Sequence, residues 1–234
     1  KIFDNIWIQP AAGDAGGALG GAYSVYYQEY DNERVINPDK MDKMQGAFLG
    51  PKFSDKEIKK YLDSVNAKYE YINNEDNLTD IVSGEIANEK VVGWHYDRME
   101  FGPRSLGHRS IVADARSQKM QSTMNLKIKY RESFRPFAPS ILIEKASDWF
   151  ELNVESPYML LVAPVKKSKQ IFTTKEQNNL FGIEKLNIKR SEIPAVTHVD
   201  YSARIQTVHK ETNARYHKLI SKFEEKTGCA TIVN

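Results

Sequence analysis

Strand-like runs and amphipathic helical patterns alternate along most of this chain, and that alternation constrains the fold more than any other feature. Short apolar or alternating runs predict strands at residues 6–9, 68–72, 91–94, 140–143, 159–162, 204–208 and 230–233. Helical periodicity separates these runs and predicts helices at residues 22–27, 77–88, 117–130 and 212–228. The interleaved order predicts an α/β fold in which helices flank a twisted mixed sheet.

The N-terminal segment carries a glycine-rich stretch at residues 11–21, between the strand predicted at 6–9 and the helix predicted at 22–27. A strand, a glycine turn and a helix form a layout that binds phosphate. The same small residues would equally allow close helix packing, so both interpretations stay open. Asp14 is expected near the N-terminus of the helix, where a carboxylate is favoured.

A polar connector without sustained periodicity is predicted at residues 31–50, and we place a domain boundary there. Directly after it, Ser54 and Glu57 match a capping box. The helix that begins there has one apolar face, made of Ile58, Leu62 and Val65.

The strand at residues 91–94 is predicted to be buried and central, and it leads directly into a loop punctuated by glycine and proline. Loops at the ends of central strands are where α/β sheets usually bind ligands. Further apolar positions are expected to face inward from the flanking helices: Leu78, Ile81, Val82, Ile86, Met120, Met124, Ile128, Tyr216, Leu219, Ile220 and Phe223. The polar stretch at 166–190 is predicted to be a surface excursion.

Basic side chains concentrate between residues 104 and 135, although the net charge of the whole chain is only +2. The stretch holds eight lysines and arginines against two acidic residues: Arg104, Arg109, Arg116, Lys119, Lys127, Lys129, Arg131 and Arg135 against Asp114 and Glu132. Arginine binds phosphate with paired hydrogen bonds, each worth roughly 1.5–3 kcal/mol when charged. The stretch predicts a phosphate or nucleotide site, whereas the nearly balanced overall charge argues against a general nucleic-acid binder.

Arg104 and Arg109 lie on the loop and are the first candidate ligands of a phosphate. The structural alternative pairs these arginines with neighbouring carboxylates: Asp97, Glu100 or Asp114. Lys127 and Lys129 should point in different directions from their helix, so at most one of them shares a site with Arg131. Residues 134–139 mix aromatics and prolines with Arg135, a composition that suits the rigid wall of a cleft or an ordinary helix end.

His198 and Asp200 precede Arg204 and offer a base or a polar orienting group beside a cation. A histidine near a carboxylate is more often a structural pair, so catalysis is the minority interpretation. The five histidines show no helical His-x-x-x-His spacing, and neither a P-loop nor a nucleophile elbow occurs.

The single cysteine, Cys229, excludes an intramolecular disulfide and lies among apolar neighbours, where it is expected to be inert. This cysteine usage fits a reducing cytoplasm. The sequence contains neither a transmembrane span nor a signal peptide, so no membrane partner is expected. The start at Lys1 and the end at Asn234 predict an excised piece of a longer protein.

Five blocks of the chain resemble the NodU/CmcH family of O-carbamoyltransferases, a group that includes the tobramycin carbamoyltransferase. The blocks occur in the right order at residues 9–20, 98–107, 109–111, 131–139 and 203–208. They extend over nearly the whole chain, and five long blocks in register are far more specific than one short motif.

The resemblance implies that residues 1–30 end an actin/hexokinase-like metal-binding domain and that residues 51–234 form a truncated YrdC-like domain after the connector at 31–50. The YrdC-like domain would join carbamoyl phosphate and ATP into carbamoyl adenylate, with Mg²⁺ assisting and pyrophosphate leaving. An iron (Fe²⁺) site in the N-terminal domain would then pass the carbamoyl group to an acceptor hydroxyl. The fragment alone is expected to be an incomplete catalyst that works with its own N-terminal domain.

The resemblance also implies roles for individual residues. Arg104, Lys129 and Arg204 would bind the phosphates of carbamoyl phosphate and ATP. Further candidates for phosphate binding are Arg109, Arg131 and Arg135. Asp14 matches an acidic metal ligand, whose histidine partners would lie in sequence that this chain lacks. The chain departs from the family pattern at Asp97, Ser105, His108 and Tyr201, of which Tyr201 bears on the site near Arg204.

Two other classes of function stay open. A non-catalytic RNA-binding module would combine the cations with stacking platforms at Tyr130, Phe134 and Phe137. A small-molecule sensor would bind nucleotide without turnover. A salt-sensitive gel shift with RNA that ATP leaves unchanged would favour the RNA-binding module.

Overall fold

Six strands form one mixed sheet in the computed structural model, which describes residues 7–36 and 42–234. The strand order is β1-β2-β6-β3-β5-β4. The strands are β1 (Val92–His95), β2 (Arg109–Asp114), β3 (Pro139–Leu142), β4 (Leu161–Pro164), β5 (Ser202–Val208) and β6 (Thr231–Val233). β3 and β5 run parallel, and the other paired strands are antiparallel. The predicted α/β class with a mixed sheet flanked by helices is confirmed.

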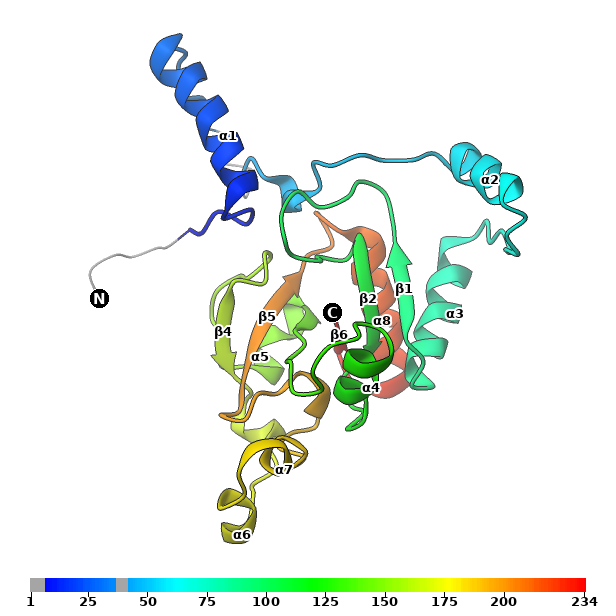
Figure 1. The fold of residues 1–234 in the computed structure, drawn as a ribbon, viewed down its shortest axis with the longest axis vertical. Helices are drawn as coiled ribbons and strands as arrows, with labels where there is room; N and C mark the ends of the chain where they lie inside the picture. The colour runs from blue at the N-terminus through cyan, green and yellow to red at the C-terminus, as the bar shows by residue number, and fades with distance from the viewer. Residues whose placement is uncertain (1–6, 37–41) are drawn as a thin grey trace.

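Two long helices, α3 (Glu75–Ala87) and α8 (Ala214–Thr227), pack against each other and against the sheet. In Figure 1, α8 lies behind β1 and β2 and α3 lies beside β1, whereas α4 (Met120–Lys127) lies in front of the sheet. The shorter helices are α2 (Asp55–Ser64), α5 (Ala146–Trp149), α6 (Lys175–Asn178) and α7 (Gly182–Leu186), with single turns η2 (Gln45–Ala47), η3 (Ile143–Lys145), η4 (Lys167–Lys169) and η5 (Pro194–Val196). No helix among the described residues is both long and apolar enough to cross a membrane.

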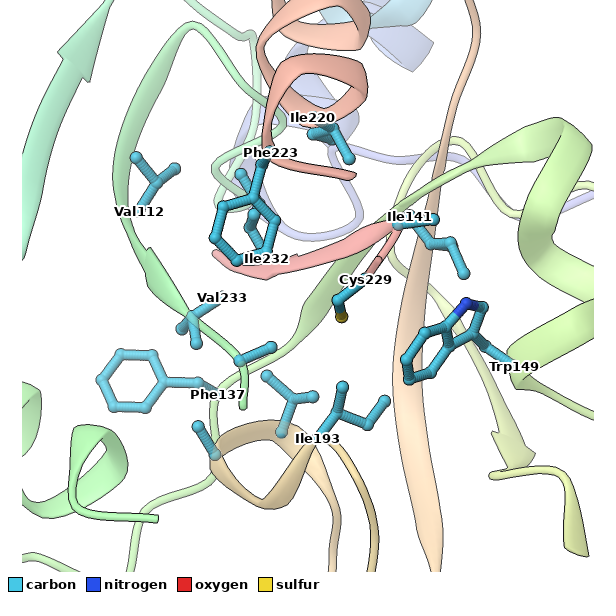
Figure 2. Close-up of a cluster of buried hydrophobic side chains, with 14 of the residues drawn as sticks. Val112, Phe137, Ile141, Trp149, Ile193, Ile220, Phe223, Cys229, Ile232 and Val233 are labelled. Carbon is cyan, nitrogen blue, oxygen red and sulfur yellow. The ribbon is translucent and has the colours of Figure 1, made fainter. Parts of the chain in front are cut away.

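The main core lies where α8 meets the sheet (Figure 2). All four apolar residues predicted for the inner face of α8 are buried: Tyr216, Leu219, Ile220 and Phe223. Asn213, one residue after the expected Thr212, caps the helix by accepting a hydrogen bond from the Tyr216 amide at 3.3 Å. Gly228 ends it at a φ of 71°, a left-handed conformation that favours glycine. Figure 2 also places Cys229 inside this core, which confirms its burial.

The other helices follow the predicted patterns in part. Met120 and Met124 are buried, but Ile128 lies beyond the end of α4 and is 41% exposed. In α3 the buried face contains Thr79 and Ser83 as well as Ile86, whereas Ile81 is exposed. Both hydroxyls donate to carbonyls of their own helix, which lets these small residues pack closely against α8. The hydrophobic pattern therefore predicted Ile86 and Val82 correctly, was wrong for Ile81, and missed Thr79 and Ser83.

The capping box of α2 is confirmed, because the Ser54 hydroxyl accepts from the Glu57 amide and the Glu57 carboxylate accepts from the Ser54 amide. No residue of α2 is buried: of its predicted apolar face, Ile58 and Val65 are exposed and Leu62 is partly buried. The strand predicted at 68–72 does not form. An alternating pattern needs a neighbouring strand, and none lies beside this segment in the described chain.

The N-terminal prediction needs correction. Residues 7–9 form no strand, and Ile6 lies outside the described residues. The glycine-rich stretch is itself helical, because α1 covers Asp14–Ser24 and continues as the π-helical turn η1 (Val25–Glu29). Asp14 opens α1, as predicted, but the strand–turn–helix layout expected for phosphate is absent from the described residues. Figure 1 shows α1 projecting away from the sheet, and neither α1 nor η1 has a buried residue.

The second half of the predicted connector packs onto the domain. Met44 and Ala47 share a small apolar cluster with Leu106 and Met159. The Ala47 carbonyl accepts a hydrogen bond from the Phe101 amide at 2.6 Å. These contacts hold residues 44–47 against the arginine-bearing loop.

Strand β1 is an edge strand, so the predicted central position is wrong. It pairs with β2 alone, and its residues alternate between partly exposed and buried. The prediction that this strand leads directly into the arginine loop is correct. The excursion at 166–190 lies largely at the surface and carries α6 and α7, although Arg190 is buried.

Candidate anion-binding pocket

A pocket of about 200 Å³ opens beside the end of β6. Six segments wall it: the loop before β2, β2 itself, the segment between α4 and β3, the turn before β4, β5 and the residue after β6. The lining residues are Pro103, Arg104, Ser105, Ile111, Lys129, Arg131, Pro136, Phe137, Ala138, Met159, Arg204 and Asn234. Four of them carry positively charged side chains and none has a side-chain carboxylate, so the side chains of the described wall are suited to an anion.

Two of the cations have little else to bind. The Nε atoms of Arg104 and Arg204 are buried and have no hydrogen-bond partner among the described residues. The Arg204 Nη2 donates to the Met159 sulfur at 3.8 Å, its one hydrogen bond to a side chain among the described residues. Burial, followed by the charge of Arg104, lowers the pKa of Arg204 below its ordinary value. The two guanidiniums thus repel each other, and an anion between them would relieve that repulsion.

Arg131 is held in place by its neighbours. Its Nε donates to the Asn125 side chain at 2.6 Å, and its guanidinium lies over the Phe137 ring at 5.0 Å. Lys129 also lines the pocket and is exposed, whereas Lys127 does not line it. Of these two lysines, Lys129 alone lines the described pocket together with Arg131.

Asn234 adds a hydrogen-bond acceptor to this wall of cations. Its Nδ2 donates to the Ser105 carbonyl at 3.0 Å and to the Gln206 Oε1 at 2.9 Å. Gln206 is itself fixed, because its Nε2 donates to the Leu106 carbonyl at 2.8 Å. Since backbone carbonyls determine the orientation of both amides, the Asn234 Oδ1 is the acceptor left over, and it is buried without a partner among the described residues.

A buried glutamate shapes the loop that carries Arg104. The Glu100 carboxylate accepts from the amides of Leu106 at 2.7 Å and His108 at 2.9 Å, and from the Arg109 Nε at 2.8 Å. Burial would raise the pKa of Glu100, but these donors hold it below its ordinary value. Gly107 completes the turn at a φ of 105°, where a Cβ would collide with the Tyr216 ring.

The predicted site residues therefore separate into two sets. Arg104, Lys129, Arg131 and Arg204 meet in the pocket. Arg109 pairs with Glu100, as the structural alternative held, and Arg135 pairs with Glu132 at 3.0 Å, so neither lines the pocket. The other two proposed partners bind elsewhere, Asp97 to Lys52 and Asp114 to Arg116.

His198 and Asp200 form a turn at the start of β5. The Asp200 carboxylate accepts from the amide and hydroxyl of Ser202, and the Ser202 hydroxyl lies 3.0 Å from the His198 Nδ1. Burial lowers the pKa of His198. Neither residue lines the pocket, and the geometry matches the structural pair more closely than a catalytic base. The Tyr201 hydroxyl donates to the Ile171 carbonyl at 3.4 Å, and Tyr201 does not line the pocket.

The described residues offer no complete metal site. No group of three or more histidine, cysteine, aspartate or glutamate side chains among them is arranged to hold a metal ion. Asp14 is exposed at the start of α1, far in sequence from the pocket residues. The described pocket lining has no carboxylate for Mg²⁺ either, so no chemical step here is assigned to a metal.

Sequence reasoning missed three supporting residues: Asn125, Gln206 and Asn234. Asn125 is completely buried on the inner side of α4, and Gln206 is buried in β5. The sequence offered one signal for these supporting residues: a polar residue at a position that the periodicity assigns to the core. Of the three predicted stacking platforms, Phe137 is buried under Arg131, so its ring cannot receive a base.

Residues 83–234 match the family model described as the carbamoyltransferase C-terminus. An uncharacterized protein of Synechocystis sp. is 58% identical over 234 residues, covering 99% of this chain and 38% of the relative. The nodulation protein NolO of Bradyrhizobium diazoefficiens is 34% identical over 100% of this chain and 38% of its own length. The 3'-hydroxymethylcephem-O-carbamoyltransferase of Amycolatopsis lactamdurans is 35% identical over 66% of this chain and 25% of its own length.

Proposed function

This chain belongs to the carbamoyltransferase C-terminus family, and from that premise we propose that it activates a carbamoyl group for transfer to a hydroxyl. In this proposal the pocket binds carbamoyl phosphate and the phosphates of ATP, and the product is carbamoyl adenylate. The observation that carries the proposal is the convergence of Arg104, Lys129, Arg131 and Arg204 on one pocket whose described wall has no side-chain carboxylate.

The reaction must release two phosphate products. The phosphorus of carbamoyl phosphate appears neither in carbamoyl adenylate nor in pyrophosphate, so inorganic phosphate leaves as well. Water is therefore a further reactant. Hydrolysis of carbamoyl phosphate gives carbamate and inorganic phosphate, and a carbamate oxygen then displaces pyrophosphate from the α-phosphorus of ATP. Each step moves negative charge between phosphoryl oxygens, and fixed cations stabilise such charge without reorganising.

The geometry of the pocket gives its residues different roles in this proposal. Arg131 is held by Asn125 and Phe137, so it is suited to orient a phosphoryl group. Arg104 and Arg204 would neutralise the dianion with guanidinium donors. The Asn234 Oδ1 is the acceptor that complements the N–H groups of a carbamoyl amide, which acetyl phosphate lacks.

The transfer step is assigned to a part of the protein that this chain does not contain. The chain spans 31–38% of the length of the NolO, NolNO and Synechocystis relatives. The helix formed by α1 and η1 has no buried residue, which supports the predicted division into an N-terminal domain ending at residue 30 and a C-terminal domain from residue 51. The YrdC-like and actin-like assignments, the iron site with Asp14 and the acceptor hydroxyl remain part of this proposal.

Isothermal titration calorimetry with carbamoyl phosphate and with ATP tests the proposal. The wild-type protein should bind both ligands, and Arg104→Ala should weaken both by about tenfold or more, the effect of losing one charged hydrogen-bonding group. Arg135→Ala is the matched control, because Arg135 lies on the neighbouring segment but pairs with Glu132 at the surface. Equal binding by the wild type and Arg104→Ala would reject the assignment.

A further inference from the structure

We propose that Tyr130 and Phe134 form an aromatic rim that receives the base of the nucleotide whose phosphates lie in the pocket. Both residues lie on the segment that joins α4 to β3. In Figure 1 this segment is the green loop that follows α4. The inference rests on the proposed function and names the part of that site that binds the nucleoside.

The pocket is too small for a whole nucleotide. Its volume of about 200 Å³ lies below the roughly 300–1,000 Å³ that is usual for sites that enclose a ligand of drug or cofactor size. Its described wall is dominated by cations, which suits phosphoryl groups rather than a base. In our proposal a nucleotide bound through its phosphates places its base on the surface beside the pocket.

The segment from 129 to 136 supplies both parts of such a site. Lys129, Arg131 and Pro136 line the pocket. Between them, the Tyr130 side chain is 86% exposed and that of Phe134 is 54% exposed. Neither ring stacks on another aromatic ring or a cation among the described residues, so their faces are available.

This segment is held in one conformation before any ligand binds. The Asn125 Nδ2 donates to the carbonyls of Ser133 at 3.1 Å and Arg135 at 2.8 Å, and so fixes the backbone on either side of Phe134. The amide of Lys129 donates to the Met124 carbonyl and that of Arg131 to the Asn125 carbonyl.

Tyr130, between those two amides, has a φ of 47°. A left-handed conformation is unfavourable for an aromatic residue and persists only where the surroundings impose it. Strained residues of this kind concentrate at ligand clamps. The backbone of the rim is thus preorganised, so binding would order little more than the two aromatic side chains.

Stacking on an aromatic ring accepts any base, because each base has a π face. The proposal therefore predicts that ATP and GTP bind similarly and that both bind more tightly than inorganic tripolyphosphate. Loss of a stacking platform costs about 1–3 kcal/mol per base, which corresponds to a weakening of roughly 5- to 150-fold.

Calorimetry on the full 234-residue chain separates the base from the phosphates. The probes are ATP, tripolyphosphate and carbamoyl phosphate, and the proteins are the wild type, Tyr130→Ala, Tyr130→Phe, Phe134→Ala and Lys129→Ala. Tyr130→Ala, Phe134→Ala or both should weaken ATP at least fivefold and leave tripolyphosphate and carbamoyl phosphate unchanged. Tyr130→Phe keeps the ring and should bind ATP like the wild type, whereas Lys129→Ala should weaken all three ligands.

The outcomes distinguish the two proposals. If the wild type binds ATP more tightly than tripolyphosphate but neither alanine variant reduces that preference, the aromatic rim is refuted and the proposed function stands. If the wild type binds none of the three ligands, the proposed function fails and the rim fails with it. A single-stranded RNA that binds through Tyr130 or Phe134 in a protein that does not bind ATP would also overturn the nucleotide assignment.

Discussion

Replacing Arg104 with methionine should stabilise the ligand-free protein while it abolishes stabilisation by an anion. The Arg104 and Arg204 guanidiniums both have a buried Nε without a partner among the described residues, and the charge of Arg104 lowers the pKa of Arg204. Methionine keeps much of the side-chain volume and removes one of the two like charges. Exchanging poorly compensated buried charge for an apolar side chain can stabilise by 1–4 kcal/mol, and the half-exposed position of Arg204 reduces this to about 1 kcal/mol.

Pyrophosphate should have the opposite effect on the wild type. A ligand present at 100 times its dissociation constant stabilises the folded state by about 2.7 kcal/mol. For a chain of this size each kcal/mol corresponds to roughly 2–4 °C in Tm, so the wild type should gain about 5–10 °C. Arg104→Met should begin about 2–4 °C above the wild type and gain almost nothing from pyrophosphate.

Urea unfolding at 25 °C, with and without pyrophosphate, measures both effects and avoids competition from guanidinium. Arg135→Met is the control: Arg135 is exposed and paired with Glu132, so its stability should stay within about 0.5 kcal/mol of the wild type and pyrophosphate should stabilise it fully. Two results together would refute the repulsion between Arg104 and Arg204. The ligand-free Arg104→Met protein would be less stable than Arg135→Met, and pyrophosphate would stabilise Arg104→Met as much as it stabilises the wild type.

Three further results are expected. Glu100→Gln should lower the free energy of unfolding by about 2 kcal/mol near pH 7, because an amide satisfies the surrounding donors poorly. The folded state lowers the pKa of Glu100, so the stabilisation by its carboxylate is present above the ordinary carboxyl pKa and is lost as the pH falls through the folded value. Urea titrations at several pH values should therefore show that the free energy of unfolding falls less steeply towards acid pH in the variant than in the wild type. Asn234→Ala should reduce the preference for carbamoyl phosphate over acetyl phosphate about fivefold in calorimetry, and an unchanged preference would exclude Asn234 as the amide acceptor. Cys229 should react with a thiol reagent only as fast as the protein unfolds, because burial raises the pKa of its thiol to about 12; rapid labelling of the native protein at pH 8 would contradict its place in the core.

The strongly periodic parts of the fold were predictable from the sequence. The inner face of α8, its glycine end, the buried strand β6 and the α2 capping box all follow local rules that one segment satisfies by itself. The edge position of β1 and the absence of a strand at 68–72 were not predictable, because both depend on which segments lie beside them. The helical glycine stretch in α1 shows the same limit, since glycine is compatible with a turn as well as with a helix.

The sequence predicted the cations of the candidate site but not the residues that hold them in place. Local charge density identified Arg104, Lys129 and Arg131, and the family resemblance added Arg204, but only the fold shows that Arg109 pairs with Glu100. A sequence does not show which arginine pairs with a carboxylate, because that choice depends on distances between loops. The amide network that orients Asn234 was invisible for the same reason.

The central claim is that these four cations form one site for the phosphoryl group of carbamoyl phosphate. A crystal structure of the chain with carbamoyl phosphate tests it most directly. The account predicts phosphoryl oxygens within hydrogen-bonding distance of the Arg104 and Arg204 guanidiniums, in the pocket beside Asn234. A ligand bound at a different surface, with this pocket holding only water at saturating concentration, would contradict it.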